Sequence, residues 1–159
     1  MVARNSQSPG VAVSNAAAWS TVTPLYGALT SWTPVVSQGA TPTLTVTRAT
    51  YSRAGRSVSG DGVVVITSAG TGATPVLISM PVAMASTTKN TIIGEGWLFQ
   101  ASSGFFYYGF IARETSTTCS FWRRVEGVAA SYLGTAGFTA ALANLDTVSI
   151  RFVYEALTD

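Results

Sequence analysis

The stretch Thr147-Val148-Ser149-Ile150-Arg151-Phe152-Val153-Tyr154-Glu155 decides the fold class of this chain. Apolar side chains occupy every second position from Val148 to Tyr154, and the side chains between them are polar, with Val153 as the exception. Successive side chains of a β-strand point to opposite faces of a sheet. The alternation therefore predicts a strand with one face in the core and the other face outside it.

The chain from Trp32 to this strand has the same character, because short apolar or β-branched runs alternate with turn residues. Gly60-Asp61-Gly62 and Gly70-Thr71-Gly72 are interpreted as turns, and Gly137–Leu145 is the helical candidate. So many short strands predict an all-β fold, an antiparallel β-sandwich of jelly-roll type, over residues 32–159. The expected strands are Trp32–Val36, Thr43–Tyr51, Ser57–Ser59, Gly62–Thr67, Val76–Met80, Thr91–Gln100, Phe105–Arg113, Cys119–Val125 and Thr147–Glu155.

A tight turn is expected where Tyr51 ends a strand and Gly55 follows, since glycine accepts a positive φ. Arg53 and Arg56 flank that glycine. We expect these arginines to pair with an acid or with carbonyl groups at a strand end, in a structural role.

Residues 1–31 are predicted to form an extended N-terminal arm, because neither the period of a strand nor that of a helix persists there. An unstructured N-terminus is the alternative, since chain ends are poorly ordered unless something holds them. Trp19 favours the arm, because large aromatic side chains are usually buried against something. The candidate docking residues of the arm are Val11, Val13, Trp19, Leu25 and Tyr26.

The composition points to a protein whose faces are covered by neighbours. Charged residues make up 10% of the chain and apolar residues 47%, against about 25% charged residues in an average soluble domain. The net charge is +2 and the basic residues are scattered, which argues against nucleic acid as a partner. The most apolar stretch, Gly104–Ala112, is too short to span a bilayer, so no membrane partner is expected either.

Residues that commonly carry catalysis are scarce. The chain has no histidine and a single cysteine, Cys119, which excludes an imidazole base, an intrachain disulfide and a paired-cysteine metal site. Glu95 and Glu114 could face each other on neighbouring strands as a glycosidase pair. Ion pairing or solvation is the ordinary interpretation of both. We therefore expect no enzyme, no catalytic or metal-binding residues and no cofactor.

Aromatic residues concentrate in one part of the chain, between residues 97 and 122. They could fill the core alone, fill the core and a subunit interface, or form a platform for a ligand such as a sugar. The candidate interface or ligand residues are Trp97, Phe106, Tyr108, Phe110 and Trp122.

An ordered set of short motifs resembles a known group of proteins. The motifs are Trp32-Thr33-Pro34, Tyr51-Ser52-Arg53-Ala54-Gly55-Arg56-Ser57-Val58, Gly70-Thr71-Gly72 before Val76-Leu77-Ile78-Ser79-Met80-Pro81, Tyr108-Gly109, and Ile150-Arg151-Phe152-Val153-Tyr154-Glu155-Ala156. Together they cover residues 32–156 and resemble the β-sandwich (jelly-roll) domains of tailed-phage head decoration, minor tail and tail-fibre proteins.

The resemblance implies a homotrimeric structural component of a phage virion. Fibre domains usually follow a long shaft, whereas here a short chain begins at Met1 with an arm of about thirty residues. That difference favours a capsid decoration (cement) protein on the capsid surface, docked partly through the arm onto the major capsid protein or other virion proteins. The alternative is a tail-fibre or minor tail module that binds the host surface, with glycans as one candidate ligand.

Overall fold

The computed structural model describes residues 27–70, 74–123, 131–132 and 141–158, of which 131–132 are described by backbone alone. These residues form strands, turns and coil, and no helix. The strands are β1 (Thr30–Ser31), β2 (Val36–Ser37), β3 (Leu44–Ala54), β4 (Ser57–Ile66), β5 (Leu77–Ser79), β6 (Ile92–Gln100), β7 (Phe105–Arg113), β8 (Thr118–Arg123), β9 (Ser131–Tyr132) and β10 (Thr147–Glu155).

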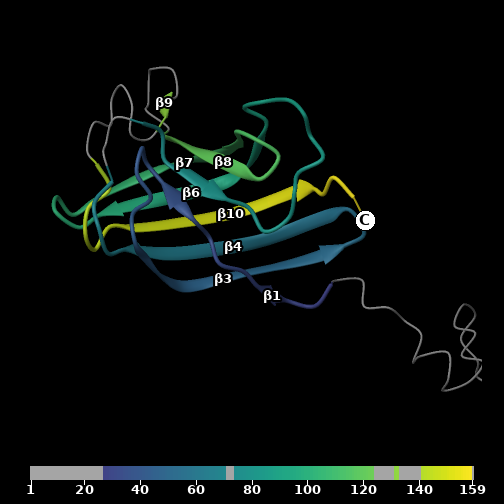
Figure 1. Cartoon of the computed structure of the whole chain (residues 1–159), viewed down its shortest axis with the longest axis horizontal. Helices are drawn as coiled ribbons and strands as arrows, with labels where there is room; N and C mark the ends of the chain where they lie inside the picture. Colours follow the sequence, from purple (N-terminus) through teal and green to yellow (C-terminus); the bar gives the residue numbers. More distant parts are fainter. Residues whose placement is uncertain (1–26, 71–73, 124–130, 133–140, 159) are drawn as a thin grey trace, which may run out of the picture.

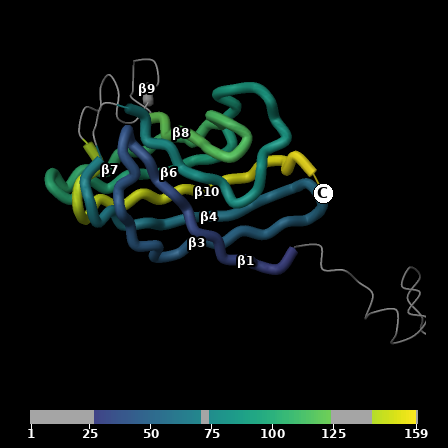
Figure 2. Tube along the Cα trace, viewed as in Figure 1, coloured from purple at the N-terminus to yellow at the C-terminus, as the bar shows by residue number. Residues whose placement is uncertain are grey.

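The strands form one antiparallel sheet in the order β1-β3-β4-β10-β6-β7-β8-β5-β2, and β9 pairs with β8. The antiparallel all-β prediction is therefore confirmed. β1 and β2 lie at opposite ends of this order, yet only Trp32–Val35 separates them in the chain. A stretch of that length reaches about 18 Å at most. The sheet must therefore curl until its edges approach each other, and Figures 1 and 2 show the resulting half-barrel.

The segment between β1 and β2 connects the two edges of the sheet. The backbone N–H of Trp32 donates to the carbonyl of Ala49 on β3 (3.1 Å), and that of Ser79 on β5 donates to the carbonyl of Val35 (2.8 Å). The N–H of Val35 in turn donates to the Ser79 hydroxyl (2.8 Å). The expected strand Trp32–Val36 is therefore a crossing segment, where Pro34 has no N–H to contribute to a ladder.

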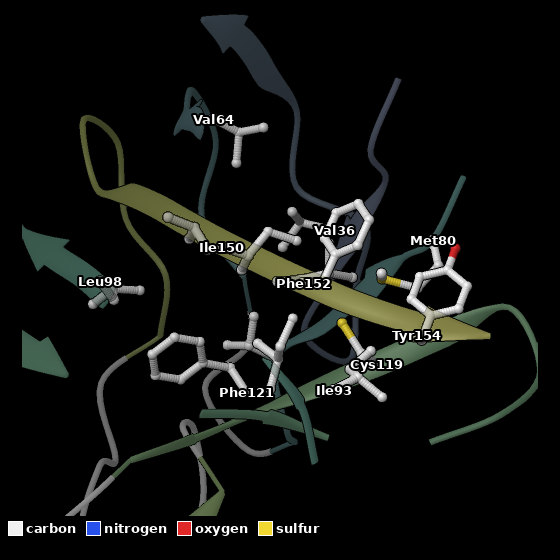
Figure 3. Close-up of a cluster of buried hydrophobic side chains, with 14 of the residues drawn as sticks. Val36, Val64, Met80, Ile93, Leu98, Cys119, Phe121, Ile150, Phe152 and Tyr154 are labelled. Carbon is white, nitrogen blue, oxygen red and sulfur yellow. The ribbon is translucent and has the colours of Figure 1, made fainter. Parts of the chain in front are cut away.

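The core fills the inside of the curled sheet, and β10 runs through its middle (Figure 3). The inward side chains from Val148 to Tyr154 are at most 8% exposed, whereas Val153 on the outer face is 62% exposed. The alternation predicted for this strand is confirmed. Phe121 of β8 and Phe152 of β10 are the largest fully buried side chains.

Glycines on the inner face make room for these rings. A Cβ at Gly96 would lie 2.7 Å from Cε2 of Phe121, and one at Gly60 would lie 2.7 Å from Cζ of Phe152. The turn predicted at Gly60-Asp61-Gly62 is wrong, because β4 continues through it from Ser57 to Ile66. Glycine within a strand can mark close packing rather than a turn.

The β3–β4 turn has the geometry expected for it. Gly55 has a φ of +54°. Arg53 Nε donates to the Gly55 carbonyl (2.8 Å), and the Arg53 guanidinium also donates to the Thr158 carbonyl. Arg56 Nε donates to the Ala156 carbonyl (3.2 Å), and its guanidinium lies 3.6 Å from the Glu155 carboxylate. The predicted pairing of both arginines is confirmed.

Both ends of the described chain meet at this turn. Gly27 lies directly against the backbone of Arg53, and Thr158 receives the hydrogen bond from the same arginine. Figure 1 shows the C-terminal end beside the end of β3. The chain before Gly27 and the chain after Thr158 are therefore attached at one end of the half-barrel.

The predicted arm and the helical candidate lie partly outside the residues that the structure describes. The arm residues Val11, Val13, Trp19, Leu25 and Tyr26 lie outside the described residues. Of the helical candidate, residues 141–145 are described, and the helix is wrong there because they form coil and a turn. Their N–H groups are used elsewhere: that of Leu142 donates to Gln38 Oε1 (2.7 Å), and that of Leu145 donates to the Ile66 carbonyl (2.8 Å).

Candidate binding site

Six aromatic rings share the outer face of β6, β7 and β8. Strand register places Trp97 opposite Tyr108, Phe99 opposite Phe106, and Phe110 opposite Trp122. The neighbours Leu98 and Ile111 are fully buried on the inner face. By alternation, the six rings therefore point outward. We call this set, Trp97, Phe99, Phe106, Tyr108, Phe110 and Trp122, the aromatic ladder.

The rings of the ladder contact one another. The Phe106 centroid lies 4.8 Å from that of Phe99, 5.7 Å from that of Trp97 and 6.3 Å from that of Tyr108. Phe110 and Trp122 stack with their centroids 5.9 Å apart and their planes 12° apart. Such spacings lie in the range that aromatic pairs favour. The ladder therefore contains two clusters of rings, one across β6 and β7 and the other across β7 and β8.

This surface is open to solvent in the single chain. Phe106 is 52% exposed and Tyr108 is 65% exposed, while the other four rings of the ladder are half-buried. Phe105, at the start of β7, is also 63% exposed, but alternation places it on the other side of the strand from the ladder. A continuous exposed patch of large apolar side chains usually marks a place where a partner or ligand binds.

A row of charged residues crosses the sheet beside the ladder. Asp61 on β4, Arg151 on β10 and Glu95 on β6 are direct cross-strand partners, so charges of alternating sign stand next to one another. Arg48 on β3 approaches the same row, and its Nε lies 2.9 Å from Asp61 Oδ1. On the far side of Glu95, the next partner in the row is Phe110 of the ladder.

An open groove of about 760 Å³ runs between the ladder and this row. Its lining includes the rings of Trp97, Tyr108 and Phe110, and Ser149. Ser149 is the cross-strand partner of Trp97. Because its side chain is short, it leaves space beside the larger side chain of Trp97. The groove therefore combines aromatic faces with hydrogen-bonding groups. Its charged lining residues are Arg48, Asp61, Glu95 and Arg151.

The structure does not bring together Glu95 and Glu114, the two acids considered as a glycosidase pair. Glu95 is opposite Phe110, whereas Glu114 lies beyond the end of β7 and pairs with Lys89. Four residues along a strand correspond to about 13 Å. Among the residues that the structure describes, no group of three or more His, Cys, Asp or Glu side chains could hold a metal ion.

Two ionisable groups in the core are far from the groove. Burial raises the pKa of Cys119 to about 12, and Cys119 is fully buried. Burial also raises the pKa of Tyr154 to about 12. The Tyr154 hydroxyl donates to the Val82 carbonyl (2.8 Å) and accepts from the Val82 N–H (3.2 Å). Both residues belong to the packing of the core.

The five aromatic residues singled out in the sequence, Trp97, Phe106, Tyr108, Phe110 and Trp122, lie on one face of the sheet. The sequence placed Phe99 among the clustered aromatic residues but not among the five candidates, and it did not predict the charged row. The alternation of Glu95–Phe99 and of Ser149–Arg151 shows which of their side chains point outward. The pairing of β6 with β10 is also needed to show that these outward side chains are neighbours. The arm residues lie outside the described part of the chain.

Comparisons with protein-family models, with curated proteins and with solved structures found no significant match to this chain. Within the described residues, no helix has the length and apolar character needed to cross a membrane.

Proposed function

We propose that this chain is a structural subunit of a tailed-phage virion, a homotrimeric decoration (cement) protein docked on the capsid through its N-terminal arm. The motif order between Trp32 and Ala156 supports this proposal, as does the low content of charged residues, 10% of the chain. The jelly-roll form of the sandwich that the resemblance implies is part of the same proposal. The described residues themselves form an antiparallel half-barrel.

The observation that carries the proposal is the separation between the chain ends and the ladder. Glu155 ends β10 beside the β3–β4 turn, where both ends of the described chain lie. Thr147, at the other end of β10, is the cross-strand partner of Phe99 in the ladder. A nine-residue strand is about 26 Å long. An arm anchored to a particle at one end would leave the aromatic half of the outer face exposed.

A patch at the end near the chain termini supports association between copies. Ile92 and Val153 are both 62% exposed and line a common groove, and Val153 lines a second groove with Leu29, which is 77% exposed. Exposed apolar side chains that gather in this way are typical of subunit contacts. We propose that the trimer forms through this patch, Leu29, Ile92 and Val153.

The proposed trimer is tested on the full chain and on variants of the patch. Light scattering on the full chain should give the mass of three copies. Val153→Asp should give a monomer, and its circular dichroism spectrum should show that it remains folded, with a lower melting temperature than the trimer. A trimer that survives both Val153→Asp and Ile92→Asp would show that the contact lies elsewhere.

The docking step is tested by co-sedimentation with phage particles that lack this chain. The full chain should sediment with them, whereas a chain without residues 1–26 and a full chain with Trp19→Ala should remain in solution. Circular dichroism melting verifies that both variants are folded. Equal binding by these variants and the parent chain would overturn the role of the arm.

The second candidate is a tail-fibre or minor tail module that binds the host surface. The combination of aromatic faces and paired charges in the groove favours it. Electron microscopy of particles with a label on this chain distinguishes the two, because a decoration protein would be distributed over the capsid and a tail module would be found on the tail.

A further inference from the structure

We propose that the groove beside the aromatic ladder binds a neutral oligosaccharide. Trp97 and Tyr108 would stack against sugar rings, and the charged row would bond the sugar hydroxyls. The inference deepens the host-binding function above and rests on the groove being exposed in the assembled protein. It does not depend on the arm, so it can fail or succeed separately from capsid docking.

The stacking surface has the form that a sugar ring requires. A pyranose ring has faces of C–H groups, which pack against the electron-rich face of an aromatic ring. Trp97 and Tyr108 lie directly opposite each other on β6 and β7 and both line the groove. Tyr108 is 65% exposed and Trp97 is half-buried, so one ring is anchored while the other is open to a ligand.

The polar wall supplies hydrogen bonds of both kinds. A carboxylate accepts hydrogen bonds through two oxygen atoms, and a guanidinium group donates them from several N–H groups in one plane. Each can therefore bond two neighbouring hydroxyl groups of a sugar. Asp61, Arg151 and Glu95 follow one another on adjacent strands, about 4.8 Å apart. Ser149, which also lines the groove, adds a hydroxyl that can donate or accept.

The charges of the groove favour an uncharged ligand. Arg48 and Arg151 are balanced by Asp61 and Glu95, and Arg48 already forms an ion pair with Asp61. A polyanion such as a nucleic acid needs several uncompensated cations along its path. A purely apolar partner would leave the four charged groups without water or hydrogen bonds, which is costly. A neutral glycan can stack its rings on the aromatic side chains and bond its hydroxyl groups to the charged side chains.

We expect the groove to bind a sugar without cleaving it. Glycosidases place two carboxyl groups on either side of the scissile bond, facing each other across the substrate. Here Arg151 stands between Asp61 and Glu95 in the cross-strand row, so a ligand lies above the row rather than between the two acids.

The test uses the full chain and a panel of neutral oligosaccharides of glucose, galactose and N-acetylglucosamine, first on a glycan array and then by calorimetry. We expect at least one neutral glycan to bind. Trp97→Ala, Tyr108→Ala and Glu95→Gln should each weaken that binding about tenfold, the scale of one lost stacking or hydrogen-bonding contact. Phe105→Ala is the matched control, because Phe105 is 63% exposed but does not line the groove. Its affinity should equal that of the parent.

Three results would overturn the proposal. The first is that no neutral glycan binds at millimolar concentration. The second is that Phe105→Ala weakens binding as much as Trp97→Ala. The third is that Trp97→Ala or Tyr108→Ala dissociates the oligomer in light scattering, since the ladder would then be covered by a second copy of the chain.

Discussion

Trp97 on β6 lies directly opposite Tyr108 on β7, and both side chains point away from the core. Their strand neighbours Leu98 and Tyr107 are likewise opposite each other, on the inner face. Leu98 is fully buried, and Tyr107 packs against the core cluster. One alternation therefore builds two surfaces, a core inside the curled sheet and an aromatic face outside it.

The inner face should be far more sensitive to truncation than the outer face of the same strand. Phe152 is 1% exposed and Val153, its neighbour on β10, is 62% exposed. Phe152→Ala should lower the free energy of unfolding by about 3–5 kcal/mol, because it leaves a cavity. At a protein concentration low enough for the chain to be monomeric, Val153→Ala should change it by about 0.5 kcal/mol or less. Urea unfolding of both variants measures the difference, and similar losses would mean that β10 does not have one buried face.

An added side chain should destabilise the fold more at an inner glycine that has less space around it. A Cβ at Gly96 would lie 2.6 Å from the Ser149 carbonyl oxygen and 2.7 Å from Phe121. Gly96→Ala should therefore cost about 1–3 kcal/mol through overpacking. At Gly62 the closest atom would be Cζ2 of Trp32 at 3.3 Å, so Gly62→Ala should cost less. Thermal melting ranks the two variants, and the opposite order would contradict the packing of Phe121 over Gly96.

Stability should fall at alkaline pH because of two buried groups. The pKa of Cys119 rises from 9.0 to about 12 and that of Tyr154 from 10.0 to about 12, both through burial. Each group is neutral when protonated, so the folded state retains its proton at a pH where the unfolded state has lost it. This stabilisation is complete below pH 9 and is lost as the pH rises toward 12.

The thiol contribution can be isolated with Cys119→Ala. At pH 10.5 the parent should have lost about 2 kcal/mol more than this variant, relative to pH 8. Urea unfolding at both pH values measures the loss. An equal loss in the two proteins would exclude Cys119 as a source. In the folded parent at pH 8, the thiol should also fail to react with a disulfide reagent until urea unfolds the chain.

Local patterns were sufficient to predict much of the fold. The period of two in Thr147–Glu155 predicted which side chains are buried, and Gly55 between two arginines predicted the β3–β4 turn. The prediction of a turn at Gly60-Asp61-Gly62 was wrong, because Gly60 is required by a residue that is distant in the sequence. Gly60 makes room for Phe152, a partner that only strand pairing brings near.

The candidate site could be predicted in part for the same reason. Five rings of the ladder were evident because they cluster between residues 97 and 122. The charged row could not be found, since Asp61, Glu95 and Arg151 are scattered through the sequence and meet only in the order β4-β10-β6. The curl of the sheet was equally hidden, because it depends on how Trp32–Val35 connects two distant edges.

The central claim is that the outer aromatic face is the binding surface of this protein. The most direct measurement is a nuclear magnetic resonance titration of the full chain with the neutral glycan selected on the array, following the indole N–H signals of the four tryptophans. Trp97→Phe identifies one signal and Trp32→Phe another. We expect the Trp97 signal to shift until binding is saturated, while the signal of Trp32, which packs on Phe152 in the core, stays in place. A shift at Trp32 with none at Trp97 would contradict the central claim.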